Sequence, residues 1–422
     1  MNKRTFDKLD LDVFEDVLEN GLKVYICPLD RNGIHARMVT RYGSSVLEFK
    51  PEGKDDYIKI PKGTAHFLEH KMFAQEDGTD IMDVFHKNGA TSNAYTSAFQ
   101  TVYHFTGPTH FMDNLENLLN CVTKPYYTEE NVAREMGIID QEIKASFDNP
   151  GNMAYYTTIK NVFSKVPFRY PVAGTSASIK EITPDILYDC YNTFYHPSNM
   201  YLVITGNVDV VKTMDFIRNY FASRNYEDKK EITIKKYSEP REVFKKREVI
   251  KRDVTNKIID SGYKVYIGDN DLPLNRLLSY LSIYLIVKFG SISKFNKMSF
   301  EDKNILSPVS WYVTVVDDFV MVEFGTEVIE ENNIFELIYD NINDKHFSAD
   351  DFDLVKKNSI KSFVVNSDGV GSVANMIDYQ VNLYGDVIYS TYDELINLNY
   401  DECLNVIREM DFSNYTCTIV ER

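Results

Sequence analysis

The sequence is poor in cysteine and lacks the CxxC spacing that marks many metal and redox sites. Its five cysteines are odd in number and scattered, at Cys27, Cys121, Cys190, Cys403 and Cys417. This usage is typical of reduced thiols in a cytoplasm. We therefore expect the cysteines to be small core residues and not metal ligands.

Long apolar runs are also missing. The start of the chain has a few basic residues but no uninterrupted apolar stretch behind them, which argues against a secretory signal. The most apolar segment, Leu277–Phe289, is too short to span a bilayer and is interrupted by Ser and Tyr. We expect a buried helix there, no transmembrane segment, no membrane partner and a cytoplasmic location.

Positive charge is scarce. The formal net charge is −17, and the isoelectric point is near 5.0. A chain without a surplus of Lys and Arg cannot neutralise many phosphates, which argues against a nucleic-acid partner. A well-solvated acidic surface explains the charge most simply, and a preference for basic peptide substrates is the alternative.

The sequence does contain enough apolar material for two cores. A chain of 422 residues is too long for one core, and its 44% hydrophobic content is that of a folded protein. From Ala222 to Lys257 charged residues of alternating sign dominate, which is typical of a linker. We predict a first domain over residues 1–225, a charged linker over 226–257 and a second domain over 258–422.

Hydrophobic periodicity predicts both strands and helices in each half. In the first half we expect strands at Leu22–Cys27 and Met200–Thr205 and helices at Thr109–Cys121 and Thr128–Ser146. In the second half we expect two strands within Val309–Phe324, around Asp317 and Asp318, and helices at Ala349–Val364 and Asp393–Met410.

Residues 66 to 70 read HFLEH, the pattern H-x-x-E-H, which reverses the more familiar H-E-x-x-H. On a helix, His66, Glu69 and His70 fall within an arc of about 100°, so two imidazoles and one carboxylate face one point. Two neutral imidazoles suit zinc, but such a site needs one more protein ligand and an open position for water. The motif alone also fits a surface helix with solvated His and Glu.

A second helix offers the missing ligand. The helix predicted from Thr128 has an apolar stripe from Val132 to Ile143 that fixes its buried face. Glu135 and Glu142 are seven residues apart, nearly two turns, so they lie on the same side at the edge of that stripe. We expect both glutamates to approach a buried site from this helix.

Other polar residues have simpler interpretations. Four acidic residues that follow the motif look like an exposed turn and helix start rather than ligands: Glu76, Asp77, Asp80 and Asp83. Three histidines match no ligand spacing and are expected at the surface or hydrogen-bonded in the core: His86, His104 and His110. His196, which precedes Pro197, looks structural.

Together these features resemble the insulinase (pitrilysin) family of zinc metallopeptidases, or inverzincins. In that family H-x-x-E-H is followed at a distance by E-x(6)-E, and here 72 residues separate His70 from Glu142. Four further segments look like family landmarks in family order: NGLKVYI (20–26), GATSNAYTS (89–97), REMGIIDQEI (134–143) and FYHPSNMYLVITGNVD (194–209). The stretches GTAHFLEHKMF and FYHPSNM are most similar to the bacterial YmfH-like branch, whose members are similar to the mitochondrial processing peptidase.

The resemblance implies an α+β fold. It implies two related α/β-roll domains of the processing-peptidase type, each an antiparallel sheet with helices packed on one face. It also implies one Zn²⁺ per chain, with His66, His70 and Glu142 as ligands. Glu69 would then be the general base, and Glu135 would orient a ligand from behind.

The resemblance also implies how substrate and partner are bound. The peptide would add as a strand to a sheet edge that contains Asn93 and Ala94. Self-sufficient family members carry an Arg, followed seven residues later by a Tyr, that contact substrate carbonyls opposite the zinc. The corresponding region here, Phe295–Val313, contains no Arg. The chain therefore looks like the zinc-bearing half of a homo- or heterodimer in which a paralogous chain supplies the Arg and Tyr.

A function of another class remains open. A binding or scaffold protein of peptidase fold could hold zinc for structure only. The intact Glu69 favours the peptidase, because a structural zinc site does not need a general base beside it.

Overall fold

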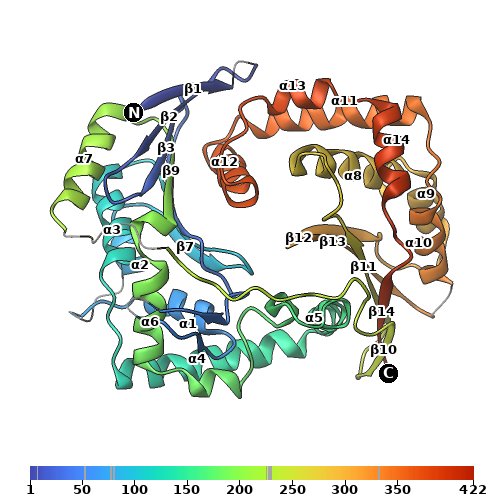
Figure 1. Cartoon of the computed structure of the whole chain (residues 1–422), viewed down its shortest axis with the longest axis horizontal. Helices are drawn as coiled ribbons and strands as arrows, with labels where there is room; N and C mark the ends of the chain where they lie inside the picture. The colour runs from blue at the N-terminus through green and yellow to red at the C-terminus, as the bar shows by residue number, and fades with distance from the viewer. Residues whose placement is uncertain are drawn as a thin grey trace. The chain divides into compact units, whose positions relative to one another are not determined.

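The computed structural model describes residues 1–6, 8–51, 54–76, 78, 81–224, 226, 231–330 and 333–422. They form two compact units, each assembled from separate stretches of chain (Figure 1). Unit 1 contains Met1–Ile143, Pro171–Lys236 and Val364–Ser390, and unit 2 contains Lys144–Tyr170, Tyr237–Phe363 and Thr391–Arg422. Each unit thus combines segments from both halves of the chain, whereas the sequence predicted that each domain would be one continuous range. The predicted domain boundaries at residues 225 and 258 stay predictions.

Unit 1 is built on a seven-stranded sheet, mostly antiparallel, with one parallel pair, β3 and β9. Its strands in spatial order are β1 (Asn2–Phe6), β2 (Leu11–Val17), β3 (Lys23–Pro28), β9 (Met200–Gly206), β4 (Ile34–Thr40), β8 (Thr101–Gly107) and β7 (Thr91–Thr96). The short strands β5 (Glu48–Phe49) and β6 (Ile58–Lys59) pair separately. The predicted strands at residues 22–27 and 200–205 are confirmed as β3 and β9, and β7 lies at the edge of the sheet.

Helices cover both faces of this sheet. The helices that begin in unit 1 are α1 (Thr64–Lys71), α2 (Ile81–Lys87), α3 (Phe111–Thr123), α4 (Glu129–Asp148), α6 (Pro184–Phe194), α7 (Val210–Ala222) and α12 (Val370–Tyr384), with short 3-10 turns at Ser178–Glu181 and Pro197–Asn199. On one face the ring of Phe105 packs between Phe85 of α2 and Phe111 of α3. On the other face α12 packs against Val102 and Val203. The α+β class is confirmed, and α12 adds a helix to the face that was expected to be bare.

Helix α12 comes from the C-terminal half of the chain and is tied to the sheet by a buried ion pair. Arg37 Nη1 of β4 donates to Asp378 Oδ2 of α12 at 2.8 Å, and both side chains are buried. Tyr201 of β9 donates its hydroxyl to the other carboxylate oxygen at 2.6 Å. Because Arg37 and Asp378 are 341 residues apart, no local pattern could have predicted that α12 belongs to unit 1.

Unit 2 has a five-stranded sheet in which all pairs are antiparallel except β10 and β14. Its strands in spatial order are β10 (Arg247–Lys251), β14 (Tyr415–Glu421), β11 (Lys257–Tyr266), β13 (Phe319–Val328) and β12 (Ser310–Val316). Its helices are α5 (Pro150–Val162), α8 (Leu274–Phe289), α9 (Lys294–Glu301), α10 (Ile334–Asn343), α11 (Ala349–Asn366), α13 (Thr391–Ile396) and α14 (Tyr400–Glu409), with a 3-10 turn at Pro167–Arg169. The predicted strand pair around Asp317 is confirmed as β12 and β13, with Asp317 at a positive φ of 49° in the turn.

One predicted helix of unit 2 was wrong in extent. The sequence favoured a single helix over Asp393–Met410, but the structure has α13 and α14 with a break between them. Asn399 ends the break by accepting a hydrogen bond from the Glu402 backbone N–H at 3.1 Å. Asn competes with helical backbone bonds and favours this N-cap position, so it separates the two helices.

The apolar helix α8 is confirmed as a core element. The stretch Leu274–Glu301, which contains α8 and α9, is long and apolar enough to cross a membrane by composition, yet 56% of its most apolar window is buried inside the fold. Residues of α8 such as Tyr280, Leu281 and Tyr284 pack into the main core of unit 2. A core helix of a folded domain therefore accounts for this apolar stretch.

The five cysteines are buried thiols, as predicted for small core residues. Burial raises the pKa of the Cys27, Cys190 and Cys403 thiols to about 12. A thiol with such a pKa is almost entirely protonated at neutral pH, so it is a poor nucleophile and a poor ligand.

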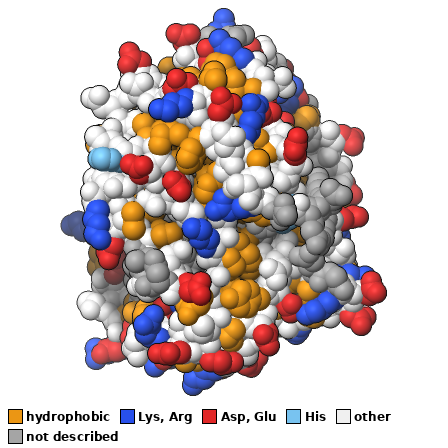
Figure 2. Space-filling model, turned by 90° about the vertical axis from the view of Figure 1, so that its left-hand side faces the viewer, with side chains coloured by type: hydrophobic (Ala, Val, Ile, Leu, Met, Phe, Trp, Pro, Cys, Tyr) orange, Lys and Arg blue, Asp and Glu red, His pale blue; other side chains and the backbone are white. Residues whose placement is uncertain are grey.

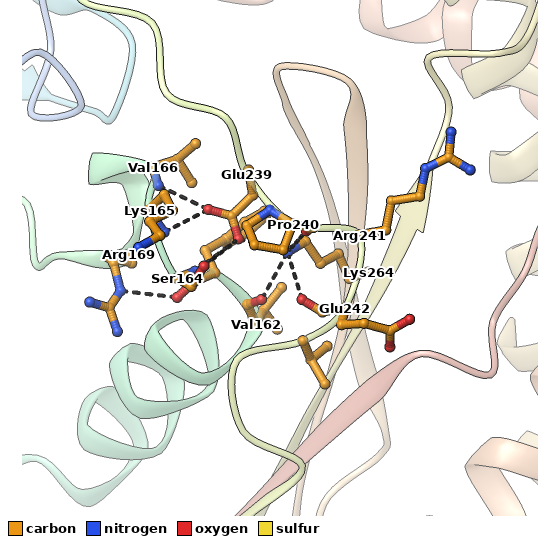
Figure 3. A network of polar contacts seen from close by, with 12 residues as sticks. Val162, Ser164, Lys165, Val166, Arg169, Glu239, Pro240, Arg241, Glu242 and Lys264 are labelled. Carbon is orange, nitrogen blue, oxygen red and sulfur yellow. Dashed lines mark hydrogen bonds and ion pairs between the residues drawn. The ribbon is translucent and has the colours of Figure 1, made fainter.

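Part of the charged segment between residues 222 and 257 is held by a polar network around Glu239. Lys264 of β11 is enclosed, and its Nζ lies 2.7 Å from Glu239 Oε1 and 2.7 Å from the carbonyl oxygen of Pro240 (Figure 3). The Glu239 carboxylate also accepts backbone N–H groups from Ser164, Lys165 and Val166 at 2.6 to 3.0 Å. This network fixes residues 239–242 of the segment to the end of α5 and to β11 within unit 2.

Replacing Lys264 with methionine is expected to lower the free energy of unfolding by about 3 to 5 kcal/mol, because it leaves the enclosed Glu239 carboxylate without its counter-ion. Urea unfolding followed by circular dichroism measures the change. The matched control is Lys245→Met, which breaks an exposed pair with Glu248 of 3.1 Å and should change stability by about 0.5 kcal/mol or less. Equal effects of the two substitutions would show that the enclosed pair does not stabilise unit 2.

The acidic composition does not create a face of one sign where the surface can be seen. On the side of the molecule drawn in Figure 2, Lys and Arg are interspersed with Asp and Glu, and hydrophobic side chains lie in patches between them. This mixture fits a solvated surface. It gives no support on that side for a preference for basic peptides.

Candidate metal centre

The H-x-x-E-H motif lies on α1, a short helix that is almost wholly buried. The helix starts after Gly63, whose φ is +90° and whose added Cβ would stand 2.4 Å from the Ala173 carbonyl oxygen. Only glycine fits this close approach. His66 and Glu69 are 9% and 7% exposed, so the motif is held inside unit 1 and is not a solvated surface helix.

Helix α4 brings Glu135 and Glu142 to the same place. Glu142 Oε1 lies 3.5 Å from His66 Nε2, and Glu142 Oε2 lies 3.5 Å from His70 Nε2. Glu135 Oε1 lies 3.0 Å from His70 Nδ1, on the opposite side of that ring. The register predicted from the apolar stripe of α4 therefore points both carboxylates at α1.

The three residues fit a zinc ion by chemistry and by spacing. One donor atom from each of His66, His70 and Glu142 lies within 4.8 Å of the others. Two bonds of about 2.0 to 2.2 Å at a tetrahedral angle separate ligand atoms by about 3.4 Å, close to the 3.5 Å between each histidine Nε2 and Glu142. Two imidazoles and one carboxylate are a donor set of catalytic zinc sites. Because Glu135 accepts a hydrogen bond from the Nδ1–H of His70, the Nε2 lone pair of that ring is available to a metal.

Glu69 lies on α1, and its side chain faces the edge strand β7. Burial raises the pKa of its carboxyl group, against the opposing effect of a hydrogen bond from Thr96 and of the two histidines. Thr96 Oγ1 donates to Glu69 Oε2 at 2.6 Å. A base whose pKa is raised toward neutrality accepts a proton more readily than an ordinary glutamate.

Glu135 and Glu142 of α4 remain ionised, because the pKa of each carboxyl group is lowered. A hydrogen bond from His70 lowers the pKa of Glu135, and one from His66 lowers the pKa of Glu142. Burial lowers the pKa of His70, but the bond to Glu135 and the nearby carboxylates raise it overall. Behind Glu135, the enclosed ammonium of Lys71 stands 4.0 Å from Oε2. Ionised carboxylates are the form that binds a cation.

Comparison with known proteins places this arrangement in a family. The family model described as insulinase (peptidase family M16) matches residues 59–176, and the model described as the peptidase M16 inactive domain matches residues 181–288. The zinc protease YmfH of Bacillus subtilis, itself described as uncharacterized, is 34% identical over 96% of this chain and 95% of its own length. The chain belongs to the insulinase family.

Solved structures agree with the assignment. An M16-like peptidase from Alicyclobacillus acidocaldarius superposes with a TM-score of 0.90 at 26% identity, covering 97% of this chain and 98% of its own. A protease from Helicobacter pylori has the same fold, with a TM-score of 0.83 at 18% identity over 97% and 99% of the two chains. The insulinase-family fold thus extends over nearly the whole chain.

In this insulinase-family chain Asn93 and Ala94 lie on β7, the edge strand next to the motif. On β7, Ser92 contacts Met82 of α2 and Thr96 contacts Glu69 of α1. Side chains alternate along a strand, so Ala94, which lies between them, faces the same side. Asn93 points to the other face of the sheet and is paired with His104. The Ala94 N–H donates to Asn93 Oδ1 at 2.9 Å. Among the described residues β7 pairs with β8 on one side only, so its outer edge lies open beside Glu69.

The remaining sequence candidates lie apart from this cluster. Glu76 is exposed, Asp83 is in the first turn of α2, and Asp77 and Asp80 lie outside the described residues. His86 and His110 are exposed, His104 stacks on His35 at 5.3 Å, and His196 Nδ1 lies 2.9 Å from Ser198 Oγ. None of the described ones joins the group of possible ligands.

Sequence reasoning missed two residues that contact the cluster. Thr96 bonds Glu69, and Lys71 approaches Glu135. Thr96 lies within the segment GATSNAYTS, and Lys71 directly follows the motif, but neither spacing indicates a contact. Only the packing of β7 and α4 against α1 creates these pairs.

Proposed function

We propose that this chain is a zinc metalloendopeptidase, or the zinc-bearing subunit of one, that hydrolyses unstructured peptides. The observation that carries the proposal is the convergence of His66, His70 and Glu142 with the buried carboxylate of Glu69 beside them. The names of the relatives, zinc protease and M16-like peptidase, support the same class of reaction.

In this proposal His66 Nε2, His70 Nε2 and the Glu142 carboxylate hold the metal. Zinc in such a set supplies a Lewis acid for the scissile carbonyl and lowers the pKa of the attacking water to about 7. Glu135 accepts a hydrogen bond from the Nδ1–H of His70. This bond orients the ring so that its Nε2 lone pair points at the site. Glu69 takes a proton from the attacking water and returns it to the leaving amine.

The substrate in this proposal is a peptide in extended form. A strand added to β7 would bind through its main chain, beside Ala94, and would replace the bond from the Ala94 N–H to Asn93 Oδ1. Main-chain pairing needs an unfolded segment and tolerates many side chains. The proposal therefore gives the substrate class, unstructured peptides, without a sequence.

The resemblance implies an Arg within residues 295–313 that would contact the substrate carbonyl, and this region contains no Arg. The same region forms α9 and β12 of unit 2. We propose a paralogous partner chain that supplies an Arg and a Tyr to the transition state. A scaffold role with structural zinc is the second candidate, and it predicts metal without hydrolysis.

Metal analysis tests the ligand set. The purified protein should contain about one zinc ion per chain, and Glu142→Gln should lose most of it, because a neutral amide is a much weaker ligand than a carboxylate. Glu76→Gln is the matched control, since Glu76 is exposed and stands apart from the cluster. Equal zinc in all three proteins would remove Glu142 from the site. Peptide hydrolysis that stops with a chelator and returns with zinc would separate the peptidase from the scaffold.

A further inference from the structure

The contact between Thr96 and Glu69 joins two parts of unit 1 that serve different tasks in the proposed function. Thr96 is the last residue of β7, the edge strand, and Glu69 lies on α1. Thr96 Oγ1 and Glu69 Oε2 are 2.6 Å apart, a short bond of the kind that a hydroxyl makes to a carboxylate. The residues are 27 positions apart, so this bond is a tertiary contact.

The bond leaves one carboxylate oxygen of Glu69 for chemistry. Among the described residues, Thr96 is the one hydrogen-bond donor to the Glu69 side chain. The carboxylate is buried, so Oε2 is fixed while Oε1 keeps its lone pairs for a proton. A carboxylate held at one oxygen has a defined plane, and proton transfer depends on that geometry.

Thr96 is itself held in place. It is paired with Thr101 across the β7–β8 hairpin, and the two hydroxyl oxygens are 3.3 Å apart. Thr101 in turn donates to the Tyr42 carbonyl oxygen at 2.9 Å and is buried. The hydroxyl that orients Glu69 therefore stands on a rigid hairpin and not on a mobile loop.

Strand β7 holds Thr96 and is also the edge strand on which the peptide is proposed to bind. Ala94 and Thr96 are two residues apart on β7 and point to the same side, at a spacing of about 7 Å. A peptide aligned on Ala94 is thereby also aligned on the residue that fixes Glu69. Strand pairing and base orientation are set by one element.

We propose that Thr96 is a positioning residue that holds the Glu69 carboxylate in the plane required for proton transfer, and so couples the edge strand to the base. The inference rests on the proposed peptidase function. It adds Thr96 to the proposed machinery as a residue that is not a metal ligand and acts through Glu69.

The kinetic test compares Thr96→Val, which keeps the shape and removes the hydroxyl, with Thr96→Ser, which keeps the hydroxyl. In the zinc-loaded protein with its partner, Thr96→Val should lower kcat about 10- to 100-fold, with KM and zinc content unchanged. Thr96→Ser should restore most of kcat. The control is Thr91→Val at the other end of β7, whose hydroxyl bonds the Thr106 carbonyl oxygen at 3.3 Å; its kcat should stay that of the wild type.

Four outcomes would overturn the inference. An unchanged kcat in Thr96→Val would show that Glu69 needs no orientation from β7. A raised KM with normal kcat would make Thr96 a substrate-binding residue instead. Loss of zinc, or failure of Thr96→Ser to recover, would make its role structural.

A second measurement does not depend on hydrolysis. In the metal-free protein, Thr96→Val should lower Tm, because the buried carboxylate loses its donor. In a Glu69→Met background the same substitution should not lower Tm, since there is no carboxylate to bond. An equal shift in Tm in both backgrounds would refute the contact between Thr96 and Glu69. If the wild type does not hydrolyse peptides but the expected Tm pattern is observed, only the proposed function is refuted.

Discussion

Glu69→Gln is expected to abolish most peptide hydrolysis while zinc stays bound at about one ion per chain. The amide cannot accept a proton from water, and loss of a general base typically lowers kcat by about a hundredfold to ten-thousandfold. The amide oxygen can still accept the Thr96 hydroxyl, so the local structure should persist. Hydrolysis of a quenched-fluorescent unstructured peptide, together with zinc analysis, measures both effects.

The control for this substitution is Glu76→Gln, the same change on an exposed residue beyond the helix that carries the motif. It should leave zinc and hydrolysis at wild-type levels. Wild-type rates in Glu69→Gln would end the proposed mechanism, because a group other than Glu69 would then have to serve as the base. Loss of zinc in Glu69→Gln would instead assign Glu69 to the metal.

The second large effect concerns the partner. The chain alone should fold normally and bind zinc but cleave unstructured peptides poorly. Loss of one donor to a developing oxyanion typically costs about a hundredfold to a thousandfold in rate. Addition of a paralogous chain that carries Arg-x(6)-Tyr and lacks H-x-x-E-H should raise the rate by a factor of that order.

The experiment measures cleavage of a peptide library by the chain alone, by the mixture, and by a mixture in which the partner's Arg is replaced by Ala. The last should behave like the chain alone, while replacement of an Arg on the partner's outer surface should have no effect. Full activity of the isolated chain would contradict the proposal. A donor would then have to come from this chain, with Lys297, Lys303 and the 67%-exposed Tyr312 as the candidates.

Sequence-based expectations succeeded where a feature depends on neighbours along the chain. Strands β3 and β9 and helices α3, α4 and α11 were predicted within a few residues, because their apolar periodicity is local. The break between α13 and α14 was missed, since a continuous apolar pattern hid the capping role of Asn399. Periodicity reports which face is buried, and it is less sensitive to where a helix ends.

Domain organisation shows the limit of linear reasoning. The segment 144–170 joins unit 2 and the segment 364–390 joins unit 1. The pairs that secure them, such as Arg37 with Asp378 and Lys264 Nζ with the carbonyl oxygen of Val162, link residues that are distant along the chain. A sequence without an alignment gives no signal for such pairs, because a buried ion pair is composed of residues that are usually exposed.

By itself, the sequence determined the family resemblance and the spacing of the metal-binding residues. The positions of His66 and His70 on one helix, and of Glu135 and Glu142 on another, follow from the helical repeat alone. Tertiary structure decided what lies around them: the burial of α1, the ammonium of Lys71 behind Glu135, and the Thr96 hydroxyl on Glu69. The physical reason is that helix geometry is fixed by hydrogen bonds between residues four apart. The environment of a carboxylate is fixed by whichever strand or helix packs against it, and that depends on the whole fold.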